Sequence, residues 1–381
     1  MIHVGLNLIF LVPGETGGME VYARELTAAL AAHPGLRLTA FVNRETELEE
    51  DGPWGGRVAV IRVPVNARNR MEWVRGEQQL LPSMAERAGC RIVHSLASTA
   101  PLHGDFLRVT TIHDLIFRIY PAAHFGFRAV GMRAIVPLGA KRSHRVIADS
   151  RSTRDDLERL YGVPRERMDV VPLAGRFDDL VPPLPEPEVR ELLALGDRQI
   201  ALSVSAKRPH KNLLRLLEAL ALIEPAERPV LVIPGYATPH EAELRARAAS
   251  LRIEDDVRFP AWLPTPALEG LYRAAAVFVF PSLYEGFGLP VLEAMARGVP
   301  VAVSDRSSLP EVAGDAALYF DPERPDAIAA AIRRLLRDRD EAERLRAAGA
   351  LRAARFTWEA TAAGTIAAYE RALGHPLELA A

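Results

Sequence analysis

Residues 277–298 read VFVFPSLYEGFGLPVLEAMARG and contain the order of elements that decides the fold. The apolar run VFVF is typical of a strand that is buried on both faces, and a polar loop with two glycines follows it. Pro290 stands where a helix should begin, because proline lacks an N–H that the first helical turn would leave unpaired. A strand, a glycine loop and a helix in this order predict one unit of a parallel α/β sheet.

The same alternation of apolar runs and amphipathic stretches extends along the whole chain. We expect strands at 2–12, 37–42, 58–63, 91–95, 108–112, 145–148 and 168–171, and again at 199–204, 229–233, 256–259, 276–280, 300–303 and 317–320. We expect helices at 19–33, 71–88, 127–142 and 151–161, then at 211–222, 239–251, 265–274, 290–297 and 325–337, with a helical tail from 339 that breaks at Phe356–Thr357. Ser152 and Asp155 have the spacing of a capping box at the start of the helix 151–161.

A proline-rich segment, residues 174–188 (AGRFDDLVPPLPEPE), interrupts this alternation and is the predicted linker. We therefore expect two Rossmann-like α/β domains, 1–173 and 189–356, with a cleft between them. Open parallel sheets bind ligands beyond the carboxyl ends of their strands. The loops that follow strands are consequently the places to search for functional residues.

Composition excludes several classes of protein. The 381 residues carry a formal net charge of −2, which argues against a nucleic-acid partner. The single cysteine, Cys90, excludes an intrachain disulfide framework and a cysteine-rich metal centre, and it fits a cytoplasmic location. No apolar run approaches the roughly 20 residues that span a bilayer. The start MIHVGLNLIFLVPG lacks the basic residues of a signal peptide and predicts a buried strand.

Lysine is rare in this chain, and two of its three lysines lie close together. Lys207, Arg208 and Lys211 stand between the expected strand 199–204 and the helix that follows it. The positive end of a helix dipole disfavours cations unless an anion offsets them, and lysine binds phosphate as a point charge. The cluster predicts a diphosphate site, with a solvated surface cluster as the alternative.

The loop within 277–298 adds groups that suit a sugar. Gly286 and Gly288 allow the N–H groups of residues 286–289 to face an anion. Glu285 and Glu293 can each accept hydrogen bonds from neighbouring hydroxyls. Because N–H donors suit phosphate and carboxylates suit hydroxyls, this loop predicts a pocket for a nucleotide sugar.

Two loops of the first half also follow strands. Gly17 and Gly18 precede a helix, where free N–H groups offer an anion site or the glycines form only a tight turn. His113 and Asp114 end the expected strand 108–112, and Asp114 is expected to orient the loop or the acceptor. No residue is an evident covalent nucleophile, and Glu285 is a candidate by residue type alone.

Several motifs together carry a family resemblance. Glu285 and Glu293 form an E-x7-E motif within EGFGLPVLEAMARGVPV, and PHKN (209–212), SSLPEVAGDAALYFDP (307–322) and the Gly17–Gly18 loop accompany it. With these motifs the chain resembles the family 4 retaining glycosyltransferases of GT-B fold. The resemblance covers both expected domains, and it implies that the final segment 357–381 packs back on the first domain. The first domain would bind the acceptor and the second the donor.

The resemblance implies roles for the residues of the second domain. Lys211 would bind the donor diphosphate, Glu285 would contact the transferred sugar, and Glu293 would bind the ribose hydroxyls. The backbone of Phe287, Gly288 and Leu289 would hold the sugar and the phosphate. Many relatives have an arginine where this chain has Ser205 and Ala206, so Lys207 or Arg208 would replace it as a phosphate ligand. Ala261 also replaces a glycine that is common before the base-binding segment.

For the first domain, the resemblance implies that Gly17–Gly18 approach the diphosphate and that His113 hydrogen-bonds the donor sugar. It further implies front-face attack, in which the departing diphosphate accepts the proton of the acceptor hydroxyl. Catalysis would then depend on electrostatic stabilisation of the leaving group by Lys211 and a helix N-terminus. PHKN-type relatives are often mannosyltransferases, and GDP or UDP is the expected nucleotide of the donor, with no resident cofactor.

Three further readings remain open at the level of sequence. Residues 118–145 hold basic and aromatic residues but no acidic ones, so they would contact an anionic membrane, bind an anionic acceptor, or form an ordinary solvated helix. A GT-B epimerase or phosphorylase would also bind a phosphate in the cleft. A non-catalytic protein that binds sugar nucleotides would keep the same pocket.

The sequence also predicts that no divalent metal is required. The only Asp-x-Asp match, Asp338–Arg339–Asp340, lies in the charged run LLRDRDEAER and reads as a solvated helical face. Activity measured with an excess of EDTA should therefore equal activity measured with added Mg²⁺ or Mn²⁺. Loss of activity in EDTA that Mn²⁺ restores would contradict this prediction.

Overall fold

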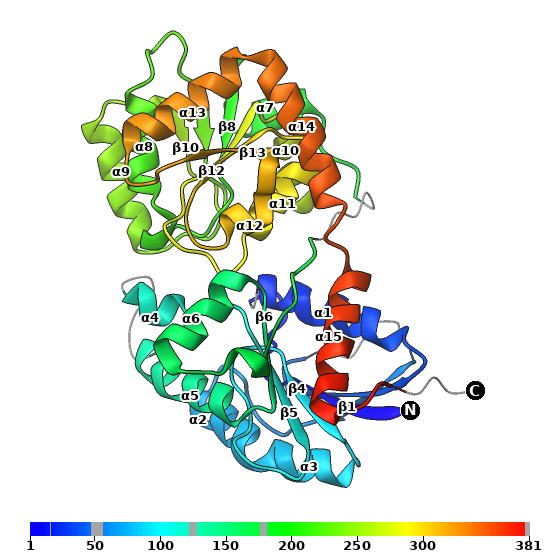
Figure 1. Cartoon of the computed structure of the whole chain (residues 1–381). Coiled ribbons are helices and arrows are strands. Elements are labelled where there is room, and N and C mark those ends of the chain that lie inside the picture. Colours follow the sequence, from blue (N-terminus) through cyan, green and yellow to red (C-terminus); the bar gives the residue numbers. More distant parts are fainter. Residues whose placement is uncertain (16, 47–55, 122–127, 176–180, 378–381) are drawn as a thin grey trace. The chain divides into compact units, whose positions relative to one another are not determined.

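The computed structural model describes residues 1–15, 17–46, 56–121, 128–175 and 181–377. The chain divides into two compact units, which are coloured along the chain in Figure 1. The first unit contains residues 1–174 and 357–381, and the second contains residues 175–356. Each unit is built around one parallel sheet.

The sheet of the first unit has seven strands in the order β3-β2-β1-β4-β5-β6-β7, and every neighbouring pair is parallel. Val4 pairs with Leu38 on one side and with Ile92 on the other, so the strand order changes direction between β1 and β4. Its strands are β1 (Ile2–Leu8), β2 (Leu36–Val42), β3 (Val58–Arg62), β4 (Ile92–Ser95), β5 (Leu107–Ile112), β6 (Arg145–Ala148) and β7 (Met168–Val170).

Helices pack on this sheet through apolar side chains. The last helix packs beside α1 and against β5 and β6, although more than three hundred residues separate it from α1 along the chain (Figure 1). Leu81 of α3 and Val136 of α5 belong to two buried clusters that attach these helices to the strands. The helices of this unit are α1 (Gly18–Ala31), α2 (Arg70–Arg75), α3 (Leu81–Arg87), α4 (Ile116–Ile119), α5 (Arg128–Arg142), α6 (Arg151–Tyr161) and α15 (Trp358–Leu373).

The sheet of the second unit has six parallel strands in the order β10-β9-β8-β11-β12-β13. All residues of β8, β9, β11 and β12 are buried, which agrees with their continuous apolar sequences. The strand order changes direction between β8 and β11, where α/β sheets place their ligands. The strands are β8 (Ile200–Leu202), β9 (Val230–Val232), β10 (Val257–Arg258), β11 (Val277–Phe280), β12 (Val301–Ser304) and β13 (Ala317–Phe320).

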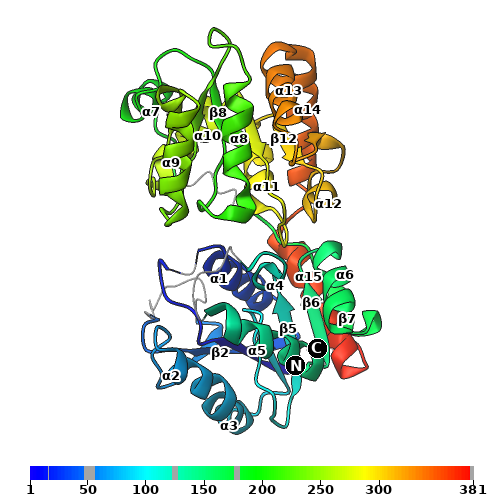
Figure 2. The ribbon, with the colours of Figure 1, turned by 90° about the vertical axis from the view of Figure 1, so that its left-hand side faces the viewer.

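Helices cover both faces of the second sheet. In Figure 1, α8, α9 and α13 lie on one face and α10, α11 and α14 on the other, and Figure 2 looks at the face that α8 covers. Leu216, Leu244 and Ile332 place the first group in one buried core. The helices are α7 (Glu186–Leu192), α8 (Leu213–Ala221), α9 (His240–Ser250), α10 (Thr265–Ala274), α11 (Leu289–Ala296), α12 (Leu309–Ala313), α13 (Pro325–Arg337) and α14 (Arg339–Ala353).

Some local predictions were wrong. The helix α6 is capped by Ser150, whose Oγ accepts a hydrogen bond from the N–H of Thr153 at 3.0 Å, and not by the predicted box of Ser152 and Asp155. The first strand ends at Leu8 because the chain turns there, four residues before the predicted end. A helix, α7, begins at Glu186, inside the segment predicted as linker. The predicted helix 71–88 consists of α2, a π-helical turn at Gly76–Leu80 and α3.

The basic stretch 118–145 falls on the end of α4, on α5 and on the start of β6, and its residues 122–127 lie outside the described residues. Arg145 is used within the fold, where its guanidinium pairs with Asp169 at 2.7 Å. Lys141 and Arg142 are exposed. In the described part of the chain, no helix has both the length and the apolar character needed to cross a membrane. Contact of this stretch with a membrane surface stays a prediction.

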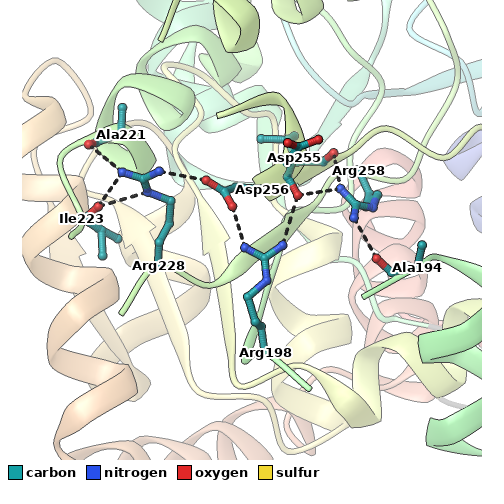
Figure 3. Close-up of polar contacts among 9 residues, drawn as sticks. Ala194, Arg198, Ala221, Ile223, Arg228, Asp255, Asp256 and Arg258 are labelled. Atoms are coloured by element: carbon teal, nitrogen blue, oxygen red, sulfur yellow. Dashed lines mark hydrogen bonds and ion pairs between the residues drawn. The ribbon is translucent and has the colours of Figure 1, made fainter. Parts of the chain in front are cut away.

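An arginine–aspartate network joins the amino ends of β8, β9 and β10 (Figure 3). Asp256 accepts hydrogen bonds from Arg198 at 2.5 Å and from Arg228 at 2.8 Å. Arg228 also donates to the Ile223 carbonyl at 2.8 Å, beyond the end of α8. Burial alone would raise the pKa of Asp256, but the hydrogen bonds from Arg228 and Arg198 hold it below its usual value. The network lies at the sheet edge opposite to the ligand loops, so we assign it to stability.

Replacing Asp256 by Asn should lower the free energy of unfolding by about 2 kcal/mol at pH 7, the size of a charged hydrogen bond. A carboxyl with a lowered pKa stabilises the folded state above its usual pKa and ceases to do so as the pH falls through its folded pKa. The difference between wild type and Asp256→Asn in urea unfolding should therefore shrink below about pH 4. The exposed neighbour provides the control, because Asp255→Asn keeps the carbonyl that Arg198 uses. Equal stability of wild type and Asp256→Asn at pH 7 would contradict the assignment.

Candidate active site

Two residues predicted to be catalytic meet at the carboxyl edge of the second sheet. The Nζ of Lys211, from the loop after β8, lies 2.6 Å from Oε1 of Glu285, from the loop after β11. The Lys211 ammonium also lies 5.2 Å from the centre of the Phe280 ring. The side chains of Lys211 and Glu285 keep 15% and 9% of their surface exposed, so solvent still reaches the pair. The ion pair occupies the point where the strand order changes direction.

Asn212 fixes the position of Lys211, and sequence reasoning did not single it out. Its φ of +59° is a left-handed conformation that asparagine tolerates better than most residues, and it stands directly before α8. Its side-chain amide donates to the carbonyls of Pro281 at 3.0 Å and Pro322 at 2.7 Å. The loops after β8, β11 and β13 are thereby joined. The position of an asparagine immediately before a predicted helix could have indicated this role from the sequence.

Two serines after β12 hold the glycine loop. The hydroxyl of Ser308 donates to the carbonyls of Glu285 at 3.0 Å and Phe287 at 2.6 Å, and the hydroxyl of Ser307 donates to the Glu285 carbonyl at 2.5 Å. Gly288 has a φ of +120°, and a Cβ there would lie 2.8 Å from a methyl group of Leu309. The resemblance pointed to the segment that contains these serines but not to their contacts.

The loop leads directly into α11. Phe287 is buried, with its ring edge against Phe356 at 5.8 Å between ring centres. Gly288 precedes the helix, and Leu289 and Pro290 are its first residues. The first N–H groups of any helix have no acceptor within the helix, and they carry the positive end of its dipole. Binding of an anion by this turn and by Gly286 stays a prediction.

Glu293 lies in α11 in a polar group that the sequence did not predict. The Tyr272 hydroxyl donates to its carboxylate at 3.1 Å, and the Arg297 guanidinium donates to its carbonyl at 2.9 Å. The same guanidinium lies 4.8 Å from the centre of the Tyr272 ring and is paired with Glu269. Burial raises the pKa of Glu293, with Arg297 acting in the opposite direction. Tyr272 therefore orients the carboxylate that is predicted to bind a ribose, and the charge of Arg297 favours its ionised form.

Lys207 does not lie where an anion can reach it, which contradicts its predicted role as a phosphate ligand. Its side chain is fully buried, and Nζ donates to the carbonyls of Gly235 at 2.7 Å and Pro260 at 3.3 Å. Glu241 of α9 lies 3.5 Å away. Burial lowers the pKa of Lys207, and Glu241 opposes this effect. Lys207 thus connects the loops that follow β8, β9 and β10.

The loops that Lys207 connects approach one another closely. Gly235 has a φ of +145°, and a Cβ there would lie 2.2 Å from the Ser205 carbonyl, which explains the glycine. Beyond it, the rings of Tyr236 and Trp262 lie against each other at a tilt of 31°, with centres 4.9 Å apart, and remain 45% and 66% exposed. Arg208 precedes the short 3₁₀ turn Pro209–Lys211 and is half-buried. Its predicted contact with phosphate stays a prediction.

In the first unit, Gly17 caps α1 with a φ of +59°, and Gly18 is the first residue of the helix. Among the described residues, and apart from the chain neighbours of each glycine, no atom lies within 4 Å of a Cβ built at Gly17 or Gly18, so close packing within this part of the chain does not explain them. Glu20 in the first turn accepts a hydrogen bond from the N–H of Gly14 at 2.9 Å and pairs with Arg24. Residue 16 lies outside the described residues. The approach of Gly17–Gly18 to a diphosphate stays a prediction.

His113 stands at the carboxyl end of β5, as predicted, but both of its ring nitrogens already have partners. Nδ1 lies 2.7 Å from Oδ2 of Asp149, which follows β6, and Nε2 lies 2.8 Å from the carbonyl of Leu96, which follows β4. Burial alone would lower the pKa of His113, but Asp149 and the Leu96 carbonyl raise it to about 9. In this arrangement neither ring nitrogen is available to a donor sugar. Asp149 was missed because only the fold brings it to His113.

Asp114 uses one carboxylate oxygen locally. Its Oδ1 accepts a hydrogen bond from the N–H of Ile116 at 2.9 Å, at the start of α4. This contact agrees with the expectation that Asp114 orients the loop, and its contact with an acceptor stays a prediction. Asp338 of the Asp-x-Asp match caps α14, because its carboxylate accepts a hydrogen bond from the N–H of Glu341.

Known proteins resemble both units. Residues 16–174 match the family model "Glycosyltransferase Family 4", and residues 186–352 match the model "Glycosyl transferases group 1". O-antigen chain mannosyltransferase B of Escherichia coli is 35% identical over 266 residues, which cover 69% of this chain and 70% of the relative. The chain belongs to glycosyltransferase family 4. It is therefore a hexosyltransferase.

Other relatives and structures extend the likeness along the chain. D-inositol 3-phosphate glycosyltransferase of Jonesia denitrificans is 27% identical over 94% of this chain and 92% of its own length. Sucrose-phosphate synthase from Thermosynechococcus elongatus superposes with a TM-score of 0.76 at 23% identity and covers 98% of this chain and all of its own. HepE of Anabaena, solved with UDP and glucose, has a TM-score of 0.75 at 18% identity, over 97% of this chain and 100% of HepE. These neighbours establish the GT-B fold of the glycosyltransferase.

Replacing Lys211 by Met should lower kcat by about 100-fold or more, the usual effect of removing one electrostatic group that stabilises a leaving group. Glu285 is 7% exposed and would lose its partner, so folding stability should also fall, by up to about 3 kcal/mol, and turnover should be compared well below the unfolding temperature of the variant. Turnover at saturating donor and the midpoint of thermal unfolding should be measured side by side. Wild-type turnover in Lys211→Met at saturating donor would remove Lys211 from the catalytic residues.

Proposed function

We propose that this glycosyltransferase transfers a hexose, with mannose favoured, from a nucleotide diphosphate sugar to a hydroxyl of a glycan, lipid-linked or small-molecule acceptor, with retention of the anomeric configuration. The observation that carries this proposal is the ion pair of Lys211 and Glu285 at the switch point of the second sheet, near the start of α11. The second unit would hold the donor, and the first would recognise the acceptor.

The ion pair suits a ligand that carries both phosphate and sugar hydroxyls. An ammonium and a carboxylate 2.6 Å apart neutralise each other in the free protein. A diphosphate that enters would compete for Lys211 with its own negative charge. Glu285 would then be released to accept hydrogen bonds from the sugar. One ligand would therefore satisfy both side chains at once, whereas a bare phosphate would leave Glu285 without a partner.

In the reaction one bond breaks, one bond forms and one proton is transferred. The bond between the anomeric carbon and the diphosphate oxygen breaks, and its electron pair stays on the diphosphate. The acceptor hydroxyl oxygen bonds to the same face of the anomeric carbon, and its proton passes to the leaving diphosphate oxygen. Lys211 and the first N–H groups of α11 would stabilise the negative charge that develops on the leaving group. No residue of this chain needs to form a covalent intermediate in this scheme.

Two comparisons support the choice of donor. The relatives from Escherichia coli and Salmonella typhimurium are O-antigen chain mannosyltransferases, which favours mannose as the sugar. HepE, which has the same fold, was solved with UDP-glucose, and this supports a nucleotide sugar as the donor. The exposed rings of Tyr236 and Trp262, on the second unit, offer apolar surface for a nucleotide base. GDP-mannose is consequently the first donor to test, and UDP sugars are the second.

Thermal unfolding with UDP, GDP, ADP and dTDP sugars would test this function. A true donor stabilises the folded state by RT ln(1 + [L]/Kd), about 2.7 kcal/mol at a concentration of 100 Kd. We expect GDP-mannose to raise the unfolding temperature of wild type, with a much smaller rise in Lys211→Met. The product formed with a positive donor should show the anomeric configuration of that donor by NMR. Absence of stabilisation by every sugar nucleotide, or an inverted product, would refute the proposal.

A further inference from the structure

Both loops that carry the ion pair of the second unit are held by their backbones. The N–H of Glu285 donates to Oγ of Ser307 at 3.1 Å, and its carbonyl accepts from the hydroxyls of Ser307 and Ser308. Asn212, the residue after Lys211, is tied by its side chain to carbonyls of two neighbouring loops. The two loops therefore stay in place, and the ion pair opens by rotation of the two side chains.

The carboxylate of Glu285 has few alternatives to Lys211. Its contact with Nζ of Lys211, at 2.6 Å, is the one ion pair or side-chain hydrogen bond that it makes within the described residues. Glu285 is only 7% exposed, so water reaches it poorly. A carboxylate that leaves such a partner loses a charged hydrogen bond and regains little hydration. Opening of the pair is therefore unfavourable unless a ligand brings new donors to Glu285.

A diphosphate without a sugar brings no such donor. Its ionised oxygens accept hydrogen bonds and carry negative charge, as the carboxylate itself does. An ammonium has three N–H groups, but a carboxylate that stayed in contact with it would face the charge of the phosphates. Whether it leaves Lys211 or stays, Glu285 opposes the binding of a diphosphate at this ammonium.

A nucleotide sugar differs in what it offers to Glu285. The hydroxyls of a hexose are donors, so the carboxylate can exchange the ammonium for hydroxyls while Lys211 exchanges the carboxylate for phosphate. Transfer of the sugar then removes these hydroxyls from the nucleotide. The nucleoside diphosphate that remains holds Lys211 and leaves Glu285 without a partner.

We propose that Glu285 makes this site discriminate between an intact nucleotide sugar and the nucleoside diphosphate left after transfer, because the carboxylate competes with the diphosphate for Lys211. The ion pair re-forms as the product leaves, which weakens the hold of the site on that product. This inference rests on the proposed function and adds to it a role of Glu285 in product release.

Calorimetric titration of Glu285→Gln with GDP and with GDP-mannose tests this role. Glutamine keeps the length of the side chain and a hydrogen-bond acceptor but loses the charge that holds the ammonium. We expect the variant to bind GDP about 10-fold more tightly than wild type, the size of one charged hydrogen bond. The Kd for GDP-mannose should change by less than about threefold, because weaker competition for Lys211 and weaker contact with the sugar hydroxyls offset each other. UDP and UDP-glucose form the second pair of ligands.

Three further variants separate this competition from a general effect of charge. Glu323→Gln is the matched control, because it removes the same charge from the loop after β13, where the carboxylate is exposed and lies 3.8 Å from Arg306. It should leave both Kd values within about twofold of wild type. Glu285→Asp keeps the charge but shortens its reach, so its Kd for GDP should be intermediate. If Glu285→Gln does not fold, Glu285→Asp decides. In a Lys211→Met background, Glu285→Gln should tighten the binding of GDP much less.

The results separate this inference from the function on which it rests. The inference is overturned if the Glu285 variant binds GDP no more tightly than wild type, if Glu323→Gln has the same effect, or if the effect persists in full without Lys211. In each of these cases wild type still binds its nucleotide sugar, and the proposed function stands. A wild-type protein that binds neither GDP, UDP nor their sugars would refute the proposed function, and the inference would fall with it.

Discussion

Parallel strands end at one edge of their sheet, and the functional residues of this protein depend on that constraint. In the second unit it brings Lys211 and Glu285, which are 74 positions apart, to within 2.6 Å. In the first unit it brings His113 between two strand ends, with Asp149 on one side. The buried apolar strands supply this geometry, because their continuous hydrophobic sequences force both faces of each sheet to be covered.

Charges near these edges are stabilised by specific partners and not by solvent. Lys207 donates to two carbonyls, His113 donates to a carboxylate and a carbonyl, and Glu293 accepts from Tyr272. An unpaired buried charge would cost several kcal/mol, so each of these contacts is needed for folding as well as for position. The pair of Lys211 and Glu285 differs from the others, because both side chains remain partly exposed. A ligand can therefore replace Glu285 as the partner of Lys211, and Lys211 as the partner of Glu285.

Much of the architecture and part of the site could be predicted from the sequence. The two runs of α/β elements and the glycine loop before α11 follow from local patterns. The meeting of Lys211 and Glu285 follows from the general rule for strand ends. Prediction from the sequence was wrong where two neighbouring residues of similar type could each fill the same role. Ser150 and Ser152 both stand near the start of α6, and only backbone geometry selects Ser150 as the cap. Lys207 and Lys211 lie four residues apart, yet one side chain points into the protein and the other towards the edge of the sheet.

The sequence by itself determined the class of fold, the family and the residue types that a sugar nucleotide requires, because these depend on periodicity and on short motifs. Only the tertiary structure decided which charged residues are free to act. It gave Lys207 a structural role, because two carbonyls from separate loops surround its ammonium. It gave both ring nitrogens of His113 a partner within the fold, because Asp149 and Leu96 arrive from the two neighbouring strands. Whether a buried polar group already has a hydrogen-bond partner depends on residues that are distant in sequence. Local sequence patterns therefore cannot predict it.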